Sequence, residues 1–135
     1  MDYIEKEFDY KGYHCVITID DLGYRCGYIQ IKEGHPLYDK NFAEINDKYT
    51  FCMKISYTGK TFPFHDDRFW IAFTCDRNGD KPDLNRVKEI WGEKPMVLTL
   101  LNMQKIPVLP RTGTIRTVEY VEDRLIQLVG EVDKL

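Results

Sequence analysis

Residues 14–38 read HCVITIDDLGYRCGYIQIKEGHPLY and contain the pattern that decides the fold. Apolar and polar side chains alternate over 13–20 and again over 24–31, which is typical of strands. The turn between them, DDLG, supplies an aspartate that accepts local backbone hydrogen bonds and a glycine that adopts positive φ. The stretch predicts an antiparallel hairpin over 13–31. A loop, Gly34–Tyr38, follows with more polar and aromatic groups than a hairpin needs.

Further strands are predicted on both sides of this hairpin. Residues 2–10 are acidic and aromatic, and we expect them to pair as an edge strand. Residues 49–57 alternate, which predicts a strand with one solvated face. Residues 68–75 are almost continuously apolar, which is typical of a central strand covered on both faces. Residues 32–47 contain a proline and a polar stretch, and they are predicted to form a long loop.

Two helices complete the predicted fold. Apolar residues between 115 and 132 gather on one side of a helical wheel, which predicts an amphipathic helix packed on the sheet. A shorter helix over 84–91 begins after Asp83, a residue suited to an N-cap, and ends at Gly92. The fold class is therefore α+β. We expect an antiparallel sheet of about four to six strands, with the C-terminal helix on one face and one shorter helix.

The length and charge of the chain limit its function. The 135 residues suit a single domain over 1–135, because a chain of this size buries enough surface for one core. The net charge of −3 at pH 7 argues against bulk nucleic-acid binding, which depends on a basic footprint on phosphates. The chain starts without the features of a secretory signal. Its longest apolar run, 96–101, is far shorter than the roughly 20 residues of a membrane span. We expect a cytoplasmic protein without a membrane partner.

Residues 93–112 have the least regular pattern. Pro95, Pro107 and Pro110 exclude a long helix, yet the runs between these prolines are too apolar to lie in water. We expect an apolar insertion or extended arm. It would cover the core, line a pocket or contact a second subunit, so a homo-oligomer is among the expected assemblies.

Neither the cysteines nor the acidic loops indicate a metal site. Each cysteine lies in an apolar run without a Cys-x-x-Cys pair, so buried reduced thiols are favoured over disulfides or zinc. The cysteines are Cys15, Cys26, Cys52 and Cys75. His65–Asp67 lacks a second histidine or cysteine at ligand spacing. Asp76–Asp83 lacks the glycine and the closing glutamate of an EF-hand. We expect no metal and no cofactor.

Groups suited to catalysis are few. His35 lies in the loop and is a candidate general base, because imidazole titrates near neutral pH. It has no visible nucleophile partner, so structural hydrogen bonding is favoured and no catalytic residue is assigned. The sequence favours a binding protein over an enzyme. The enzyme alternative is a small hydrolase or phosphodiesterase that uses His35 or His65 with Asp80.

Five sequence blocks occur along the chain in a fixed order. They are GYRCGYI (23–29), GHPLY (34–38), ISYT (55–58), FWIAFTC with a following Gly79-Asp80, and RTVEYV (116–121). Together they resemble a family of small proteins found largely in bacteriophages and prophages. Members typically read RCGYV, GHPLY, GGLTYS, WWxGFDCxHxGD and RTxEYV.

This chain departs from the family pattern at several positions. It has Met53-Lys54 in place of two glycines, Ala72 for glycine, Thr74 for aspartate and Arg77 for histidine. No role of that aspartate or histidine therefore carries over to this chain. The resemblance implies a phage context rather than a particular reaction.

A phage context favours a small protein that blocks host defence. We expect a binding protein that sequesters a nucleotide-derived signalling molecule in the host cytoplasm, with arginine pairing with phosphate and aromatic rings stacking on a base. The candidate ligand-binding residues are Arg25, Tyr28, His35, Tyr38, Tyr57, Trp70 and Arg116. The alternatives are a hydrolase that acts on such a signal and an inhibitor that binds a host defence protein through the 93–112 arm.

Overall fold

The computed structural model describes residues 2–77, 79–92 and 113–135. Five antiparallel strands form the main sheet in the order β1-β2-β3-β5-β4. They are β1 (Tyr3–Tyr10), β2 (Tyr13–Ile19), β3 (Arg25–Ile31), β4 (Tyr57–Gly59) and β5 (Phe69–Thr74). Two short strands pair separately in parallel, β6 (Asp80–Lys81) and β7 (Thr114–Ile115). The helices are α1 (Phe42–Lys48), α2 (Leu84–Trp91) and α4 (Val118–Asp133). The predicted α+β class is confirmed.

The predicted hairpin over 13–31 is confirmed. β2 and β3 pair antiparallel, and the turn between them has the expected chemistry. Oδ1 of Asp20 accepts hydrogen bonds from the N–H groups of Leu22 and Tyr24, each at 3.0 Å. Gly23 has φ 98°, which a residue with a Cβ adopts with strain. The expected edge strand is β1, which pairs with β2.

Both predicted helices and the central strand are also confirmed. β5 lies between β3 and β4 and is buried along most of its length. Asp83 caps α2 by accepting a hydrogen bond from the N–H of Arg86 at 3.2 Å. The C-terminal helix begins at Val118 rather than near 115, because the hydroxyl of Thr117 caps it by accepting from the N–H of Tyr120 at 3.2 Å.

The predicted strand over 49–57 is wrong, since only its last residue belongs to a strand, β4. Side chains take two of the backbone N–H groups that a ladder would need. The N–H of Cys52 donates to Glu131 Oε1 at 2.9 Å, and that of Ile55 donates to Asn46 Oδ1 at 3.0 Å. Of the alternating residues, those from 49 to 55 lie in or against the core cluster that includes α4, whereas Tyr57 packs against the cluster on the opposite face. The alternation that predicted a strand thus comes from an irregular segment whose apolar side chains face the core.

The predicted loop over 32–47 is partly wrong, because its end forms α1. Asn41 caps this helix by accepting a hydrogen bond from the N–H of Glu44 at 2.8 Å. Ile45 is its buried residue. A helix of two turns offers too few positions for a periodic apolar pattern, which is why periodicity alone does not identify it. The predicted 93–112 arm lies outside the described residues.

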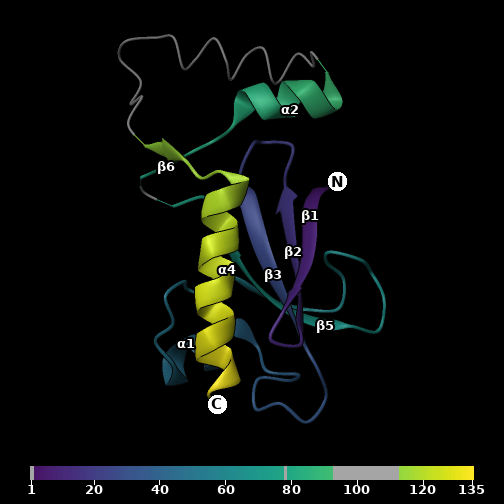
Figure 1. Cartoon of the computed structure of the whole chain (residues 1–135), viewed down its shortest axis with the longest axis vertical. Helices are drawn as coiled ribbons and strands as arrows, with labels where there is room; N and C mark the ends of the chain where they lie inside the picture. Colours follow the sequence, from purple (N-terminus) through teal and green to yellow (C-terminus); the bar gives the residue numbers. More distant parts are fainter. Residues whose placement is uncertain (1, 78, 93–112) are drawn as a thin grey trace.

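α4 covers one face of the sheet (Figure 1). Its buried side chains, including Leu125, pack among those of β2, β3 and β5. Gly27 of β3 makes this approach possible, because a Cβ there would lie 2.6 Å from Cζ of Phe73 and 3.0 Å from Cδ2 of Leu125. In Figure 1, α2 lies near the N-terminal end of α4 and α1 near its C-terminal end.

The opposite face of the sheet has a smaller core of its own. Val16, Tyr28 and Trp70 are buried there, and Phe64 from the segment between β4 and β5 packs against them. The sheet therefore has two unlike faces, one covered by a helix and one partly covered by an irregular segment.

Candidate functional site

The seven candidate ligand-binding residues lie in three separate places. One group is near the N-terminal end of α4, one is in the 34–38 loop near its C-terminal end, and one is on the sheet face opposite α4. They are Arg25 with Arg116, His35 with Tyr38, and Tyr28 with Tyr57 and Trp70. Because α4 has 16 residues, its ends are about 24 Å apart. The structure therefore does not bring the seven residues into one pocket.

Arg25 is held in a buried cluster of ion pairs, with its side chain only 5% exposed. Its Nε and Nη2 donate to the two carboxylate oxygens of Glu5, at 2.6 and 3.1 Å. Its Nη1 donates to Asp83 Oδ2 at 2.9 Å and to the carbonyl of Arg116 at 3.2 Å. Glu5 also accepts from Nε of Arg86 at 3.0 Å. Two cations thus face two carboxylates, so an incoming phosphate would have to displace a carboxylate.

Arg116 is also paired. Its Nε donates to Asp80 Oδ1 at 2.7 Å, and its guanidinium lies 4.6 Å from the ring centroid of Tyr120. The second oxygen of Asp80 accepts from the N–H of Arg77 at 3.0 Å. The pair joins the start of α4 to β6. Asp80 is therefore engaged on both oxygens, which leaves it poorly placed to serve a catalytic histidine.

His35 fastens its loop to the end of α4. Its Nδ1 accepts from the N–H of Leu37 at 3.0 Å, so its Nε2 carries the proton and donates to the carbonyl of Val132, also at 3.0 Å. Both ring nitrogens are engaged, as the structural interpretation of His35 predicts. Asp80 lies near the other end of α4, so the hydrolase alternative that pairs these two residues lacks its geometry.

The three aromatic candidates lie on the sheet face opposite α4. The ring centroid of Tyr28 lies 6.2 Å from that of Tyr57 and 6.4 Å from that of Trp70. Tyr28 is 5% exposed and Trp70 is fully buried, so neither presents a ring face to solvent. The hydroxyl of Tyr57 accepts from the N–H groups of Thr61 and Phe62, each at 3.1 Å. These rings therefore position the segment above them.

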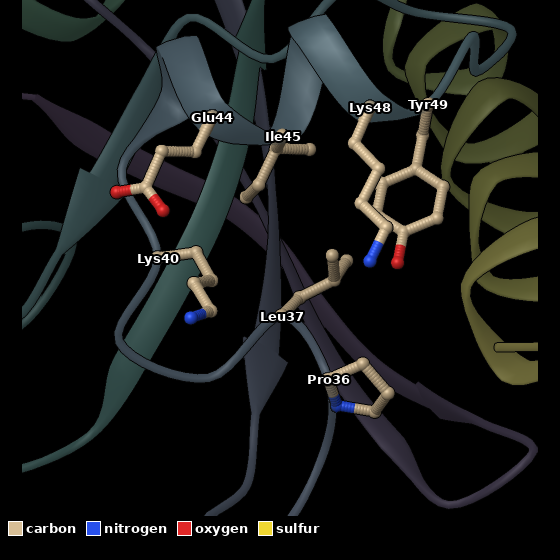
Figure 2. A pocket seen from close by; sticks show the side chains of 7 residues that line it. All are labelled: Pro36, Leu37, Lys40, Glu44, Ile45, Lys48 and Tyr49. Carbon is tan, nitrogen blue, oxygen red and sulfur yellow. The ribbon is translucent and has the colours of Figure 1, made fainter.

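A concave site does lie beside the 34–38 loop that the sequence singles out. This site, the loop–helix hollow, has a volume of about 200 Å³ and lies between that loop and α1 (Figure 2). Leu37 and Ile45 are each 1% exposed and supply apolar surface to it. Its lining residues are Pro36, Leu37, Lys40, Glu44, Ile45, Lys48 and Tyr49.

The loop–helix hollow is flanked by two cations. Lys40 and Lys48 lie on either side of Leu37 (Figure 2), and both are exposed. Within the part of the chain that the structure describes, neither ammonium forms an ion pair with a carboxylate. The Nζ of Lys48 lies 5.5 Å from the ring centroid of Tyr49. Since Glu44 is the single acidic residue of the lining, the hollow has an excess of positive charge.

Sequence reasoning missed both lysines because it predicted a loop over 32–47, which contains Lys40, and left Lys48 between that loop and the predicted strand. The signal that would have found them is Asn41, which begins α1 as a cap. With that helix in place, Lys48 falls in its last turn and Lys40 just before its start. The 34–38 loop then forms the side of the hollow that faces α1.

The thiols do not offer a nucleophile at neutral pH. All four cysteines are free. Burial raises the pKa of Cys15, Cys52 and Cys75 to about 12, and that of Cys26 to about 11. Nucleophilic cysteines require the opposite shift, toward the thiolate.

No group of three or more His, Cys, Asp or Glu residues in 2–77, 79–92 and 113–135 is arranged to hold a metal ion. No helix of these residues is long and apolar enough to cross a membrane.

Comparisons with protein-family models, curated proteins and solved structures gave no match.

Proposed function

We propose that this protein is a small binding protein that sequesters an anionic, nucleotide-derived molecule in the loop–helix hollow. The observation that carries this proposal is the pair of lysines, Lys40 and Lys48, which flank an apolar floor without carboxylate partners in the described structure. A phosphate between them would gain two charge-assisted hydrogen bonds, and these are stronger than neutral ones. Arg25 and Arg116, the cations expected from the sequence, are occupied elsewhere.

The shape of the site supports a ligand with a compact anionic head. At about 200 Å³ the loop–helix hollow is smaller than the roughly 300 Å³ at which drug-sized pockets begin. A second hollow of about 240 Å³ shares Tyr49 with it and is lined by Phe51 and Lys54 among others. A nucleotide could place its phosphate between the lysines and extend the rest of its structure past Tyr49.

Binding without turnover is favoured because the groups that could catalyse a reaction are already hydrogen-bonded within the protein. Both nitrogens of His35 and both oxygens of Asp80 are hydrogen-bonded. In the phage context that the sequence resemblance implies, removal of a nucleotide signal from the host cytoplasm would silence a defence response. The protein would then act by stoichiometry, in proportion to its own concentration.

The proposal is tested by thermal unfolding and native mass spectrometry against cyclic mononucleotides, cyclic dinucleotides and ADP-ribose. At least one is expected to bind unchanged in mass and to stabilise the protein by about 2.7 kcal/mol at a concentration of 100 times its Kd. The double variant Lys40→Ala/Lys48→Ala should bind this ligand at least about tenfold more weakly, since each lost bond to a charged group contributes about 1.5–3 kcal/mol.

The matched control is Lys60→Ala/Lys134→Ala, which removes the same charge from exposed positions that do not line the hollow. It should bind as the wild type does. The proposal fails if no member of the panel binds, or if both double variants lose affinity equally. A ligand recovered with a changed mass would instead establish the hydrolase alternative.

A further inference from the structure

The 34–38 loop, which forms one wall of the loop–helix hollow, is held by a histidine. Nδ1 of His35 accepts a hydrogen bond from the N–H of Leu37 at 3.0 Å, and Nε2 donates to the carbonyl of Val132, also at 3.0 Å. The first bond requires the neutral ring, because both nitrogens of a charged imidazole are donors. Addition of one proton to Nδ1 therefore removes a bond that holds this wall.

Leu37 is the residue at which this bond meets the proposed ligand site. Its side chain is 1% exposed and forms part of the apolar floor of the loop–helix hollow. Its carbonyl accepts a hydrogen bond from the N–H of Lys40 at 3.3 Å, and Lys40 is one of the two lysines that flank the hollow (Figure 2). A shift of the backbone at Leu37 would thus move both the apolar floor and one cation.

The ring of His35 is accessible to protons. The histidine is half-buried and lines a separate hollow of about 360 Å³. In proteins, carboxyl groups ordinarily titrate at about pH 4, and phenol and ammonium groups at about pH 10, whereas imidazole titrates near neutral pH. Burial, and then the hydrogen bond to Asp133, raise the pKa of Tyr13 further. The charged and titratable groups that line this hollow with His35 are Lys11, Tyr13, Lys32, Glu33 and Asp133.

Protonation of His35 would leave its contact with α4 in place. Nε2 remains a donor in the charged ring, and the carbonyls at the C-terminal end of a helix favour cations. The turn also persists, because the N–H of Tyr38 donates to the carbonyl of His35 at 3.0 Å. The N–H of Leu37 alone loses its acceptor, and a donor without a partner is costly in this half-buried position. The backbone at Leu37 would shift toward solvent to regain a partner.

We propose that His35 is a pH-sensitive switch that holds the loop–helix hollow in its binding form when the ring is neutral and loosens it when Nδ1 is protonated. The ligand-binding part of this inference rests on the proposed function, whereas the change at Leu37 does not. The switch predicts weaker binding of an anion in acid. Simple charge attraction predicts the opposite, because a protonated ring adds a positive charge near the site.

NMR of the ligand-free protein tests the change at Leu37. Over about pH 8 to pH 5.5 the ring of His35 should change from the neutral form with its proton on Nε2 to the charged form. The amide proton signal of Leu37 should move upfield, as a lost hydrogen bond requires, and that of Lys40 should move with the same midpoint as the ring.

Two variants make the same chemical change at different histidines. In His35→Asn the two amide signals should not move with pH, because the side-chain oxygen of asparagine can take the place of Nδ1 and does not titrate. His65→Asn changes an exposed histidine and should leave both signals as pH-dependent as in the wild type.

Isothermal titration with 3′,5′-cyclic AMP tests the effect on binding, because the phosphodiester of this probe keeps the same charge over the pH range. The wild type should bind it about threefold to tenfold more weakly at about pH 5.5 than at about pH 8, which is the effect of one lost hydrogen bond. His35→Asn should bind it equally at both pH values, and His65→Asn should behave as the wild type does.

The inference is overturned if the Leu37 amide signal does not follow the His35 ring, or if the affinity of the wild type is unchanged or higher in acid. If cyclic AMP binds at neither pH, the ligand of the proposed function is not this mononucleotide. The NMR titration, which needs no ligand, then decides for or against the switch.

Discussion

Glu5 and Arg25 form a two-point ion pair inside the protein, with side chains that are 4% and 5% exposed. Glu5 lies at the register shift of β1, between Ile4 and Lys6. Such bulges redirect a side chain relative to a regular strand. The carboxylate also holds Arg86, and Arg25 also holds Asp83, so β1, β3 and α2 are joined through one neutral cluster.

Replacement of Arg25 should therefore destabilise the fold. Arg25→Ala leaves the buried carboxylate of Glu5 without its main partner, and removal of one member of a buried pair lowers the free energy of unfolding by about 3–5 kcal/mol. Urea unfolding followed by circular dichroism measures this loss. Lys6→Ala is the control, because the pair of Lys6 with Glu122 is far more exposed and contributes about 0–1 kcal/mol. An unchanged unfolding midpoint for Arg25→Ala would contradict the structural role and return Arg25 to the candidate ligand-binding residues.

Gly27 is expected to tolerate no side chain. The Cβ of Gly27→Ala would overlap the buried ring of Phe73 at 2.6 Å and press on Leu125 of α4. Overpacking of this kind lowers the free energy of unfolding by about 1–3 kcal/mol. Gly130→Ala provides the comparison, since a Cβ at that position in α4 meets nothing within 4 Å and alanine favours a helix. Thermal unfolding should show a lower melting temperature for Gly27→Ala and an equal or higher one for Gly130→Ala.

His35 should contribute to stability rather than to catalysis. His35→Ala removes the hydrogen bonds to Leu37 and Val132 and should lower the free energy of unfolding by about 1–3 kcal/mol. His65→Asn is the control, because His65 is exposed and substitutions at exposed sites usually change stability by less than about 0.5 kcal/mol. Hydrogen exchange at the N–H of Leu37 reports the same contact directly. Faster exchange in His35→Ala is expected, and unaltered exchange would show that the loop is held by other means.

His14 should make stability depend on pH. Its Nδ1 lies 2.7 Å from Asp9 Oδ1 and its Nε2 lies 2.9 Å from Glu7 Oε1, an arrangement that suits the charged ring, in which both nitrogens donate. Burial opposes the charged form, but the hydrogen bonds to Asp9 and Glu7 outweigh it and raise the pKa of His14. Because the folded pKa exceeds the unfolded value of about 6.5, the stabilisation is complete below that pH. It is lost as pH rises through the folded pKa.

Thermal unfolding of the wild type and His14→Gln over about pH 5 to pH 9 measures this effect, in a range where the carboxylates stay charged. The wild type should exceed the variant in melting temperature at the acidic end, and the difference should shrink above about pH 6.5. An NMR titration of the His14 ring should give a pKa above 6.5, and Asp9→Asn should lower it. If the difference in melting temperature between the two proteins grew with pH, the trend would be opposite to the expected one. That result would exclude the ion-pair explanation.

Some of the candidate site could be foreseen from the sequence. The GHPLY block is unusual for a loop after a hairpin, and one of the hollows does lie beside it. The pairing of Arg25 could not be foreseen, because an arginine in a strand has the same local pattern whether it meets phosphate or Glu5.

The sequence by itself determined the elements whose causes are local. Alternation and a DDLG turn specify the 13–31 hairpin, continuous apolarity specifies β5, and side-chain caps with a helical apolar stripe specify α2 and α4. Only the tertiary structure decided which charges neutralise each other and where surface is left concave. The partners of Arg25 come from Glu5 and Asp83, in segments far from it along the chain. Electrostatic pairing and packing act through space, so residues distant in sequence decide whether a polar group is satisfied or available to a ligand.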